Sequence, residues 1–200
     1  MFNTQENLQE IKIIVLGNSG VGKTSIINNY IFNKFNPDIE TTFANSLSSK
    51  VIKKGKIKYK LNIWDTIGQE EYHSITNLFI KGANAVILVY SIDSLSSFEG
   101  LNFWYESTKE YLPENNYILF IVGSKSDLFE EEVVSEEEAK NFAEKRDALF
   151  KLVSSKIDPE GINNLFETIL EESIKKKIIK PNDSFVIKNK KQIKKQKKCC

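Results

Sequence analysis

Short apolar runs, most of them followed by a turn signal, recur along the chain. A compact apolar run at residues 11–16 predicts a buried strand, and unbroken runs at 85–90 and 117–122 predict strands that are buried on both faces of a sheet. Residues 149–153 predict one further short strand. Residues 56–64 alternate apolar and polar positions, which is typical of a half-exposed strand. A strand at 47–52 precedes it, and Lys54-Gly55 between the two predicts a hairpin.

Apolar residues at helical spacing fill the intervals between these strands. Helices are expected after Lys23, over 95–112, from a capping-box pattern at 135–138, and over 162–174. The apolar side of the second helix is expected to consist of Leu95, Phe98, Leu101, Trp104 and Tyr105. Strands that alternate with helices predict an α/β fold, a three-layer sandwich around a mostly parallel six-stranded sheet.

Length and charge divide the chain into a body and a tail. The 200 residues suffice for one domain, expected at 1–180, followed by a disordered basic tail at 181–200. Residues 188–200 contain seven lysines and no acid, so residues 1–187 carry a net charge of −6 although the whole chain carries +1.

The sequence gives no sign of secretion or of a membrane span. The apolar runs are too short to cross a bilayer, and the N-terminus is polar and acidic, so we expect a cytoplasmic protein. The two cysteines, Cys199 and Cys200, are the last two residues, which argues against a disulfide framework or a metal site. Lipid attachment is the better hypothesis.

The pattern G-x-x-x-x-G-K-[ST] lies between the first predicted strand and the first predicted helix. Its glycines let backbone N–H groups converge on phosphates, Lys23 would neutralise the β- and γ-phosphates, and the Thr24 hydroxyl would hold Mg²⁺. A chance glycine-rich turn would lack the flanking strand and helix. The sequence therefore predicts a nucleoside triphosphate site on Asn18, Ser19, Gly20, Val21, Gly22, Lys23, Thr24 and Ser25.

A second motif, Trp64-Asp-Thr-Ile-Gly-Gln69, resembles the W-D-T-A-G-Q of Ras-like GTPases. The resemblance implies a P-loop G domain with GTP or GDP and Mg²⁺. It assigns Asp65 to Mg²⁺ through water, and the Gly68 N–H to the γ-phosphate. Gln69 would be the catalytic residue that orients the attacking water.

Guanine selection is implied by Ser124-Lys-Ser-Asp127, which resembles N-K-x-D. The carboxylate of Asp127 can accept from both N1–H and the 2-amino group of guanine, whereas adenine offers no such pair. Lys125 would pack its stem along the base.

Two further positions complete the expected base site. Ser154-Ser-Lys156 stands where the family has S-A-K, and the Ser155 N–H would meet guanine O6. Phe35 stands where the family places a ring against the base, with ordinary core packing as the alternative. In the first switch segment Thr42 has the spacing of the Thr that closes on Mg²⁺, and Thr41 is the alternative.

Within the superfamily the chain resembles the Rab branch, and within that branch the endosomal group. The likeness spans about residues 10–175 and includes Tyr72-His-Ser74. It implies a switch that controls vesicle trafficking or fusion. Effectors would bind Leu47, Trp64 and Phe79, although core or ordinary surface hydrophobes are an equal alternative.

Departures from the family pattern predict altered kinetics. Ser124 replaces Asn, and its shorter hydroxyl is not expected to reach both the base and the phosphate loop. One lost buried hydrogen bond, about 1–3 kcal/mol, predicts faster nucleotide exchange. Ile67 replaces Ala in the second switch. The single arginine, Arg146, is far from the loop in sequence, so intrinsic hydrolysis should be slow, on the order of 10⁻⁴ to 10⁻³ s⁻¹.

The tail resembles Rab endings that receive two geranylgeranyl groups, here on Cys199 and Cys200. Two chains anchor stably, and the lysines before them favour anionic cytoplasmic leaflets. Nucleic acid is not favoured, because no aromatic residue interrupts the lysine run. The resemblance implies a monomer on an intracellular, endosomal membrane. Its partners would be an exchange factor, a GTPase-activating protein, a GDI-type prenyl carrier and effectors.

Two rival functions remain open at this point. A P-loop kinase would need an arginine-rich lid, which a single arginine argues against. A pseudo-GTPase, which binds nucleotide with little turnover, is suggested by Ser124 and Ile67 and opposed by Lys23, Thr24 and Gln69.

Overall fold

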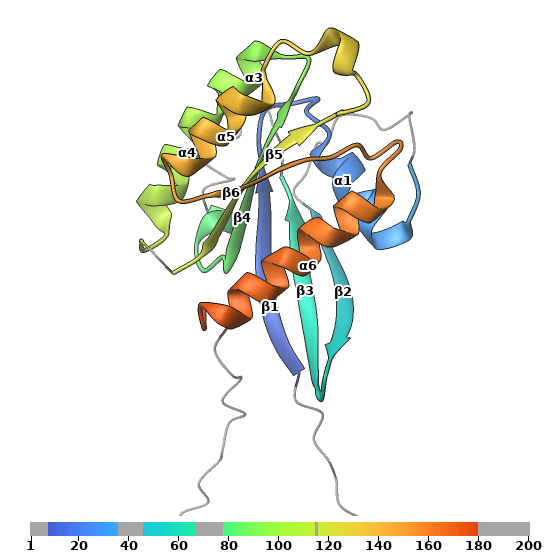
Figure 1. Cartoon of the computed structure of the whole chain (residues 1–200). Coiled ribbons are helices and arrows are strands. Elements are labelled where there is room, and N and C mark those ends of the chain that lie inside the picture. Colours follow the sequence, from blue (N-terminus) through green and yellow to red (C-terminus); the bar gives the residue numbers. More distant parts are fainter. Residues whose placement is uncertain (1–7, 36–45, 67–77, 115, 180–200) are drawn as a thin grey trace, which may run out of the picture.

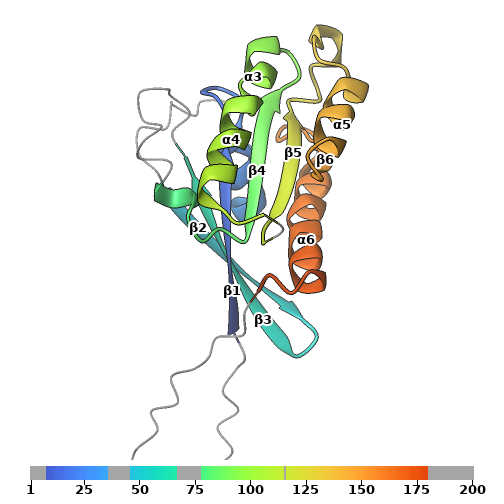
Figure 2. The same cartoon turned by 90° about the vertical axis from the view of Figure 1, so that its left-hand side faces the viewer.

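A computed structural model describes residues 8–35, 46–66, 78–114 and 116–179. These residues form a six-stranded sheet with helices on both faces, which is the predicted three-layer α/β architecture (Figures 1 and 2). The strands are β1 (Leu8–Leu16), β2 (Ser46–Lys54), β3 (Ile57–Asp65), β4 (Ala85–Ser91), β5 (Ile118–Ser124) and β6 (Leu149–Leu152). The α-helices are α1 (Lys23–Phe32), α3 (Leu95–Glu99), α4 (Leu101–Tyr111), α5 (Glu136–Glu144) and α6 (Pro159–Lys175).

The order of strands in the sheet is β2-β3-β1-β4-β5-β6. Only the β2–β3 pair is antiparallel, and it is the predicted hairpin, with Gly55 in the left-handed region (φ 63°) at its turn. The other pairs are parallel, so the carboxyl ends of β1, β3, β4 and β5 meet at one edge of the sheet. Loops at that edge are the usual place for a ligand site in such folds.

Each face of the sheet buries its own apolar core. One core joins the sheet to α1 and α6, where Tyr30 stacks on Phe166 with ring centroids 3.9 Å apart. The other joins it to α4 and α5 around Trp104. Strands β4 and β5 are buried along their whole length, as their unbroken apolar runs predict, and β3 alternates as expected.

The helix expected over 95–112 is instead two helices, α3 and α4, that meet at Gly100. Gly100 packs so closely on the phosphate loop that a Cβ there would collide with the Asn18 amide. The Ser94 side chain caps α3 by accepting from the Ser97 N–H. Leu95, expected on the buried side, is 52% exposed, because α3 and α4 are separate helices and the apolar face of α4 does not continue to Leu95.

Candidate functional site

The phosphate loop connects β1 to α1 at the carboxyl edge of the sheet (Figure 1). Gly17 directly follows β1 with φ 145°, and a Cβ there would collide with the backbone oxygen of Val89 in β4. Gly22, at φ 90°, caps α1 without a side-chain hydrogen bond. Both positions therefore need glycine, one for close packing on β4 and one for the left-handed turn into the helix.

Lys23 is bound to the loop that it follows. Its ammonium donates to the carbonyl oxygens of Gly17 and Asn18, each at 2.8 Å, and the residue is only 6% exposed. Burial lowers the pKa of Lys23 to about 8, although the nearby Asp65 carboxylate opposes this shift. The side chain is therefore mostly protonated at neutral pH and carries a positive charge at the mouth of the loop.

Thr24 and Asp65 meet beside that charge. The Thr24 hydroxyl donates to Oδ2 of Asp65 at 2.8 Å. The other oxygen, Oδ1, is buried and has no hydrogen-bond partner within the described ranges. Burial raises the pKa of Asp65, against the Thr24 hydrogen bond and the Lys23 charge. A hydroxyl beside an unpaired carboxylate oxygen is the kind of oxygen donor set that Mg²⁺ prefers, so these residues fit the ion.

Asn18 extends the loop contacts to α4, because its Oδ1 accepts from the Trp104 indole N–H at 3.0 Å. Ser19 and Gly20 are exposed at the tip of the loop, while Val21 is buried. Trp104 was expected only as a core residue. The helical spacing predicts that its ring is buried but does not identify the acceptor of its indole N–H, because that acceptor comes from elsewhere in the fold.

Ser124 lies at the end of β5 and does reach the phosphate loop. Its hydroxyl contacts the carbonyl oxygens of Val21 at 2.5 Å and Tyr90 at 2.9 Å. The link that Asn would make to the loop is thus retained by a shorter side chain. Because both partners are carbonyl acceptors, the single hydroxyl proton is already committed within the protein.

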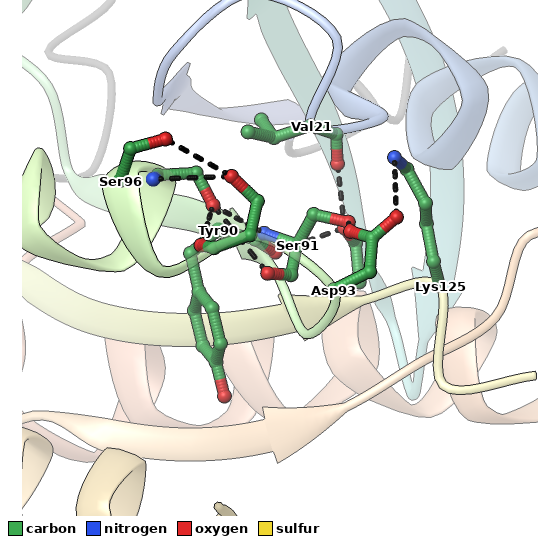
Figure 3. Close-up of polar contacts among 9 residues, drawn as sticks. Val21, Tyr90, Ser91, Asp93, Ser96 and Lys125 are labelled. Atoms are coloured by element: carbon green, nitrogen blue, oxygen red, sulfur yellow. Dashed lines mark hydrogen bonds and ion pairs between the residues drawn. The ribbon is translucent and has the colours of Figure 1, made fainter. Parts of the chain in front are cut away.

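Lys125 has a left-handed backbone (φ 58°), and its ammonium is directed at Asp93, 3.5 Å from Oδ2 (Figure 3). Asp93 also accepts a hydrogen bond from the Ser91 hydroxyl. Burial alone would raise the pKa of Asp93, but Ser91 and Lys125 together hold that pKa below its ordinary value. Sequence reasoning missed Asp93, although its place directly after β4 puts it at the carboxyl edge of the sheet.

Asp127 contacts the loop of Ser154, Ser155 and Lys156. Its Oδ1 accepts from the Ser154 hydroxyl at 2.6 Å, and Lys156 Nζ lies 3.8 Å from its Oδ2. Ser155, which follows Ser154, contacts α1, because its carbonyl oxygen accepts from the Asn29 amide at 2.8 Å. Asn29 is 3% exposed and was not predicted to be a site residue.

Phe35 follows α1 and is 41% exposed, so the alternative of core packing is wrong for this residue. The predicted effector positions do lie together. Leu47 is opposite Trp64 in the β2–β3 register, and the Trp64 and Phe79 rings are 4.9 Å apart. Leu47 is exposed, whereas the two aromatic residues are partly buried.

Several predicted positions lie outside the described residues. They are Thr41, Thr42, Ile67, Gly68, Gln69, Cys199 and Cys200. Across the described ranges, no group of three or more His, Cys, Asp or Glu side chains is placed to hold a metal. Within the same ranges, none of the helices has the length and apolar character needed to cross a membrane.

Comparison with known proteins agrees with this geometry. The model of the Ras family matches residues 12–175. The chain belongs to the Ras family. Human Ras-related protein Rab-17 is 36% identical over 165 residues, which is 82% of this chain and 77% of that protein. Ras-related protein Rab-11B of Dictyostelium discoideum is 38% identical over 170 residues, covering 83% and 76%. Rat Ras-related protein Rab-31 is 36% identical over 162 residues, covering 81% and 82%.

These similarities place the chain with the Rab-like members of the family. It is a small GTPase that binds GTP and GDP with Mg²⁺, hydrolyses GTP, and acts as a switch in vesicle trafficking. A binding module without turnover, one of the two rival functions, is not favoured.

Proposed function

We propose that Lys23, Thr24 and Asp65 form the phosphate and magnesium site of this switch. The observation that carries the proposal is the buried Asp65 carboxylate, with one oxygen held by Thr24 and the other unpaired among the described residues. Bound Mg²⁺ would supply positive charge to the β- and γ-phosphate oxygens. The Lys23 ammonium, already held at the loop, would exchange or share its two carbonyl partners with phosphate oxygens.

The switch itself rests on the sequence motifs. Thr42 and the Gly68 N–H would close on the γ-phosphate, and Gln69 would orient the attacking water. The single arginine of the sequence, Arg146, is engaged elsewhere and is not expected to stabilise the transition state of hydrolysis. That residue follows α5, donates to Asn102 and to the Phe142 carbonyl, and lies over the Phe142 ring. Intrinsic hydrolysis should therefore be slow and depend on a GTPase-activating protein.

Base selection would come from Asp127, with its carboxylate positioned by Ser154 and facing N1–H and the 2-amino group of guanine. Lys125 would cover one side of the base and Phe35 its edge, while the Ser155 N–H would meet O6. The Asn29 amide holds the loop of Ser154, Ser155 and Lys156 through its hydrogen bond to the Ser155 carbonyl oxygen.

Membrane attachment would come from the tail, with Cys199 and Cys200 as prenylation sites after a lysine-rich segment. The partners would be an exchange factor, a GTPase-activating protein, a GDI-type carrier, and effectors that bind Leu47, Trp64 and Phe79. The compartment that the sequence favours is endosomal, on its cytoplasmic face.

The test begins with the nucleotide released when freshly purified protein is denatured, followed by titration of emptied protein with GTP and with ATP. We expect bound GDP and a strong preference for GTP. Single-turnover hydrolysis should then be compared with that of Gln69→Ala, which should lose at least about tenfold in rate at unchanged GTP affinity. ATP preference would contradict the base assignment, and an unchanged rate would contradict the role of Gln69.

A further inference from the structure

The β2–β3 hairpin is strongly basic. Residues 50–60, here called the basic hairpin, contain six lysines and no acidic residue. They occupy the end of β2, the turn at Gly55 and the start of β3. The lysines are Lys50, Lys53, Lys54, Lys56, Lys58 and Lys60.

Lys50, Lys54 and Lys58 have interactions within the protein. Lys54 pairs with Glu171 of α6 at 2.5 Å, and Lys50 donates to the Tyr30 carbonyl at 2.6 Å. The ion pairs found among the described residues do not include Lys53, Lys56 or Lys60.

Both faces of the hairpin carry lysines, but they have different surroundings. Lys50 and Lys54 lie on the face covered by α1 and α6, in register with Leu61 and Ile57. Lys53 and Lys60 lie on the other face, where Lys53 is directly opposite Lys58.

Protection of a sheet edge does not account for the whole cluster. Lysines on an edge strand prevent pairing with another sheet, and β2 is such a strand. Lys58 and Lys60, however, lie on β3, which is paired on both sides, with β2 and with β1. Their charge cannot serve to block an edge.

The position of the hairpin indicates its partner. Its turn lies at the lower end of the molecule in both views, where α6 also ends, whereas the phosphate loop lies at the opposite end of the sheet (Figures 1 and 2). The Lys54–Glu171 pair ties the hairpin to the last part of α6. The described chain stops at Ile179, and the sequence after it carries the seven lysines of 188–200 and the two cysteines.

We propose that the basic hairpin binds the anionic lipid headgroups of the membrane to which the tail attaches, and so sets the orientation of the GTPase domain. This inference rests on the membrane attachment proposed above. Each lysine held near an anionic leaflet strengthens binding about fivefold. The Leu47–Trp64 end of the hairpin is about 20 Å from Lys58 along β3, which keeps the predicted effector positions away from the bilayer.

The experiment uses the full chain and vesicles of phosphatidylcholine with or without phosphatidylserine, at about 0.1 M salt. The test variant is Lys53→Gln, Lys56→Gln and Lys60→Gln together. The control is Lys109→Gln, Lys140→Gln and Lys145→Gln, which removes the same charge from α4 and from α5 and its end. Both variants should keep the GDP affinity and thermal unfolding of the parent.

We expect the hairpin variant to bind phosphatidylserine vesicles between tenfold and a hundredfold more weakly than the parent, and the control variant to lose less than threefold. Amide hydrogen exchange at 50–60 should slow on these vesicles in the parent. Equal losses in the two variants would overturn the hairpin inference and leave membrane attachment standing. If the parent binds vesicles equally well with and without phosphatidylserine, both the hairpin inference and the proposed attachment to an anionic membrane would be overturned. Loss of binding to a short RNA, with vesicle binding unchanged, would overturn the inference in favour of nucleic acid.

Discussion

The two ends of the nucleotide site are built in different ways. At the phosphate end, Lys23 and Asp65 are almost fully buried, and the contacts of Lys23 and Thr24 are 2.8 Å long. At the base end, the Lys125 and Lys156 side chains are 38% and 61% exposed. Their ion pairs with Asp93 and Asp127 are 3.5 and 3.8 Å long.

This difference has a physical consequence. Buried, short, charge-assisted contacts lose little to solvent, whereas exposed ion pairs of this length contribute little. The phosphate end is therefore ready to bind before nucleotide arrives, while the base end depends on the ligand and on a few buried groups, chiefly Ser124, Ser154 and Asn29. We expect affinity to be set at the phosphate end, and specificity and release to be tuned at the base end.

Among the variants that test this comparison, Lys23→Ala should have the largest effect on nucleotide affinity. Loss of a charged donor at the phosphates should weaken GDP and GTP binding about a hundredfold, measured by titration with a fluorescent nucleotide. Lys81→Ala, which removes an exposed lysine outside the site, should leave affinity unchanged. Similar affinities for the two variants would mean that the phosphate end does not dominate binding.

Asp127→Asn should come next, because its amide presents a donor where guanine also has donors. GTP affinity should fall about thirtyfold while ATP affinity stays the same, so the ratio of the two is the readout. Asp147→Asn, at an exposed carboxylate, is the matched control. A parallel fall for both nucleotides would show that Asp127 acts on the fold rather than on the base.

Ser124→Asn sharpens the comparison from the other side, since it restores a group able to reach the base as well as the loop. GDP dissociation, followed by displacement of a fluorescent nucleotide, should slow about tenfold. Ser124→Ala should accelerate release, because it removes the contacts to Val21 and Tyr90. Unchanged rates in both variants would refute a role for position 124 in exchange.

Asn29→Ala has the smallest expected effect. It leaves the Ser155 carbonyl without its α1 donor, and GDP release should quicken about fivefold, equivalent to about 1 kcal/mol. Asn141→Ala, on an exposed position of α5, should not change release. An effect of equal size in the control would show that the link between α1 and the base loop is unimportant.

The local predictions succeeded where one segment decides its own structure. The buried strands β4 and β5 and the alternating β3 were read from apolar spacing, because burial on one or both faces leaves a direct trace in sequence. The helix expected over 95–112 failed at Gly100. The glycine at that break packs on Asn18, which is distant in the chain, so the pattern of one segment could not show it.

The chemistry of the site shows the same division. The phosphate loop, Asp65 and the guanine motifs are named by residue type and spacing, so the sequence by itself determined the family, the nucleotide and the residues to examine. Only the tertiary structure decided that Ser124 reaches Val21, that Asp93 faces Lys125, and that Asn29 holds Ser155. These contacts join segments between 32 and 126 residues apart, and packing rather than local pattern sets which polar groups meet.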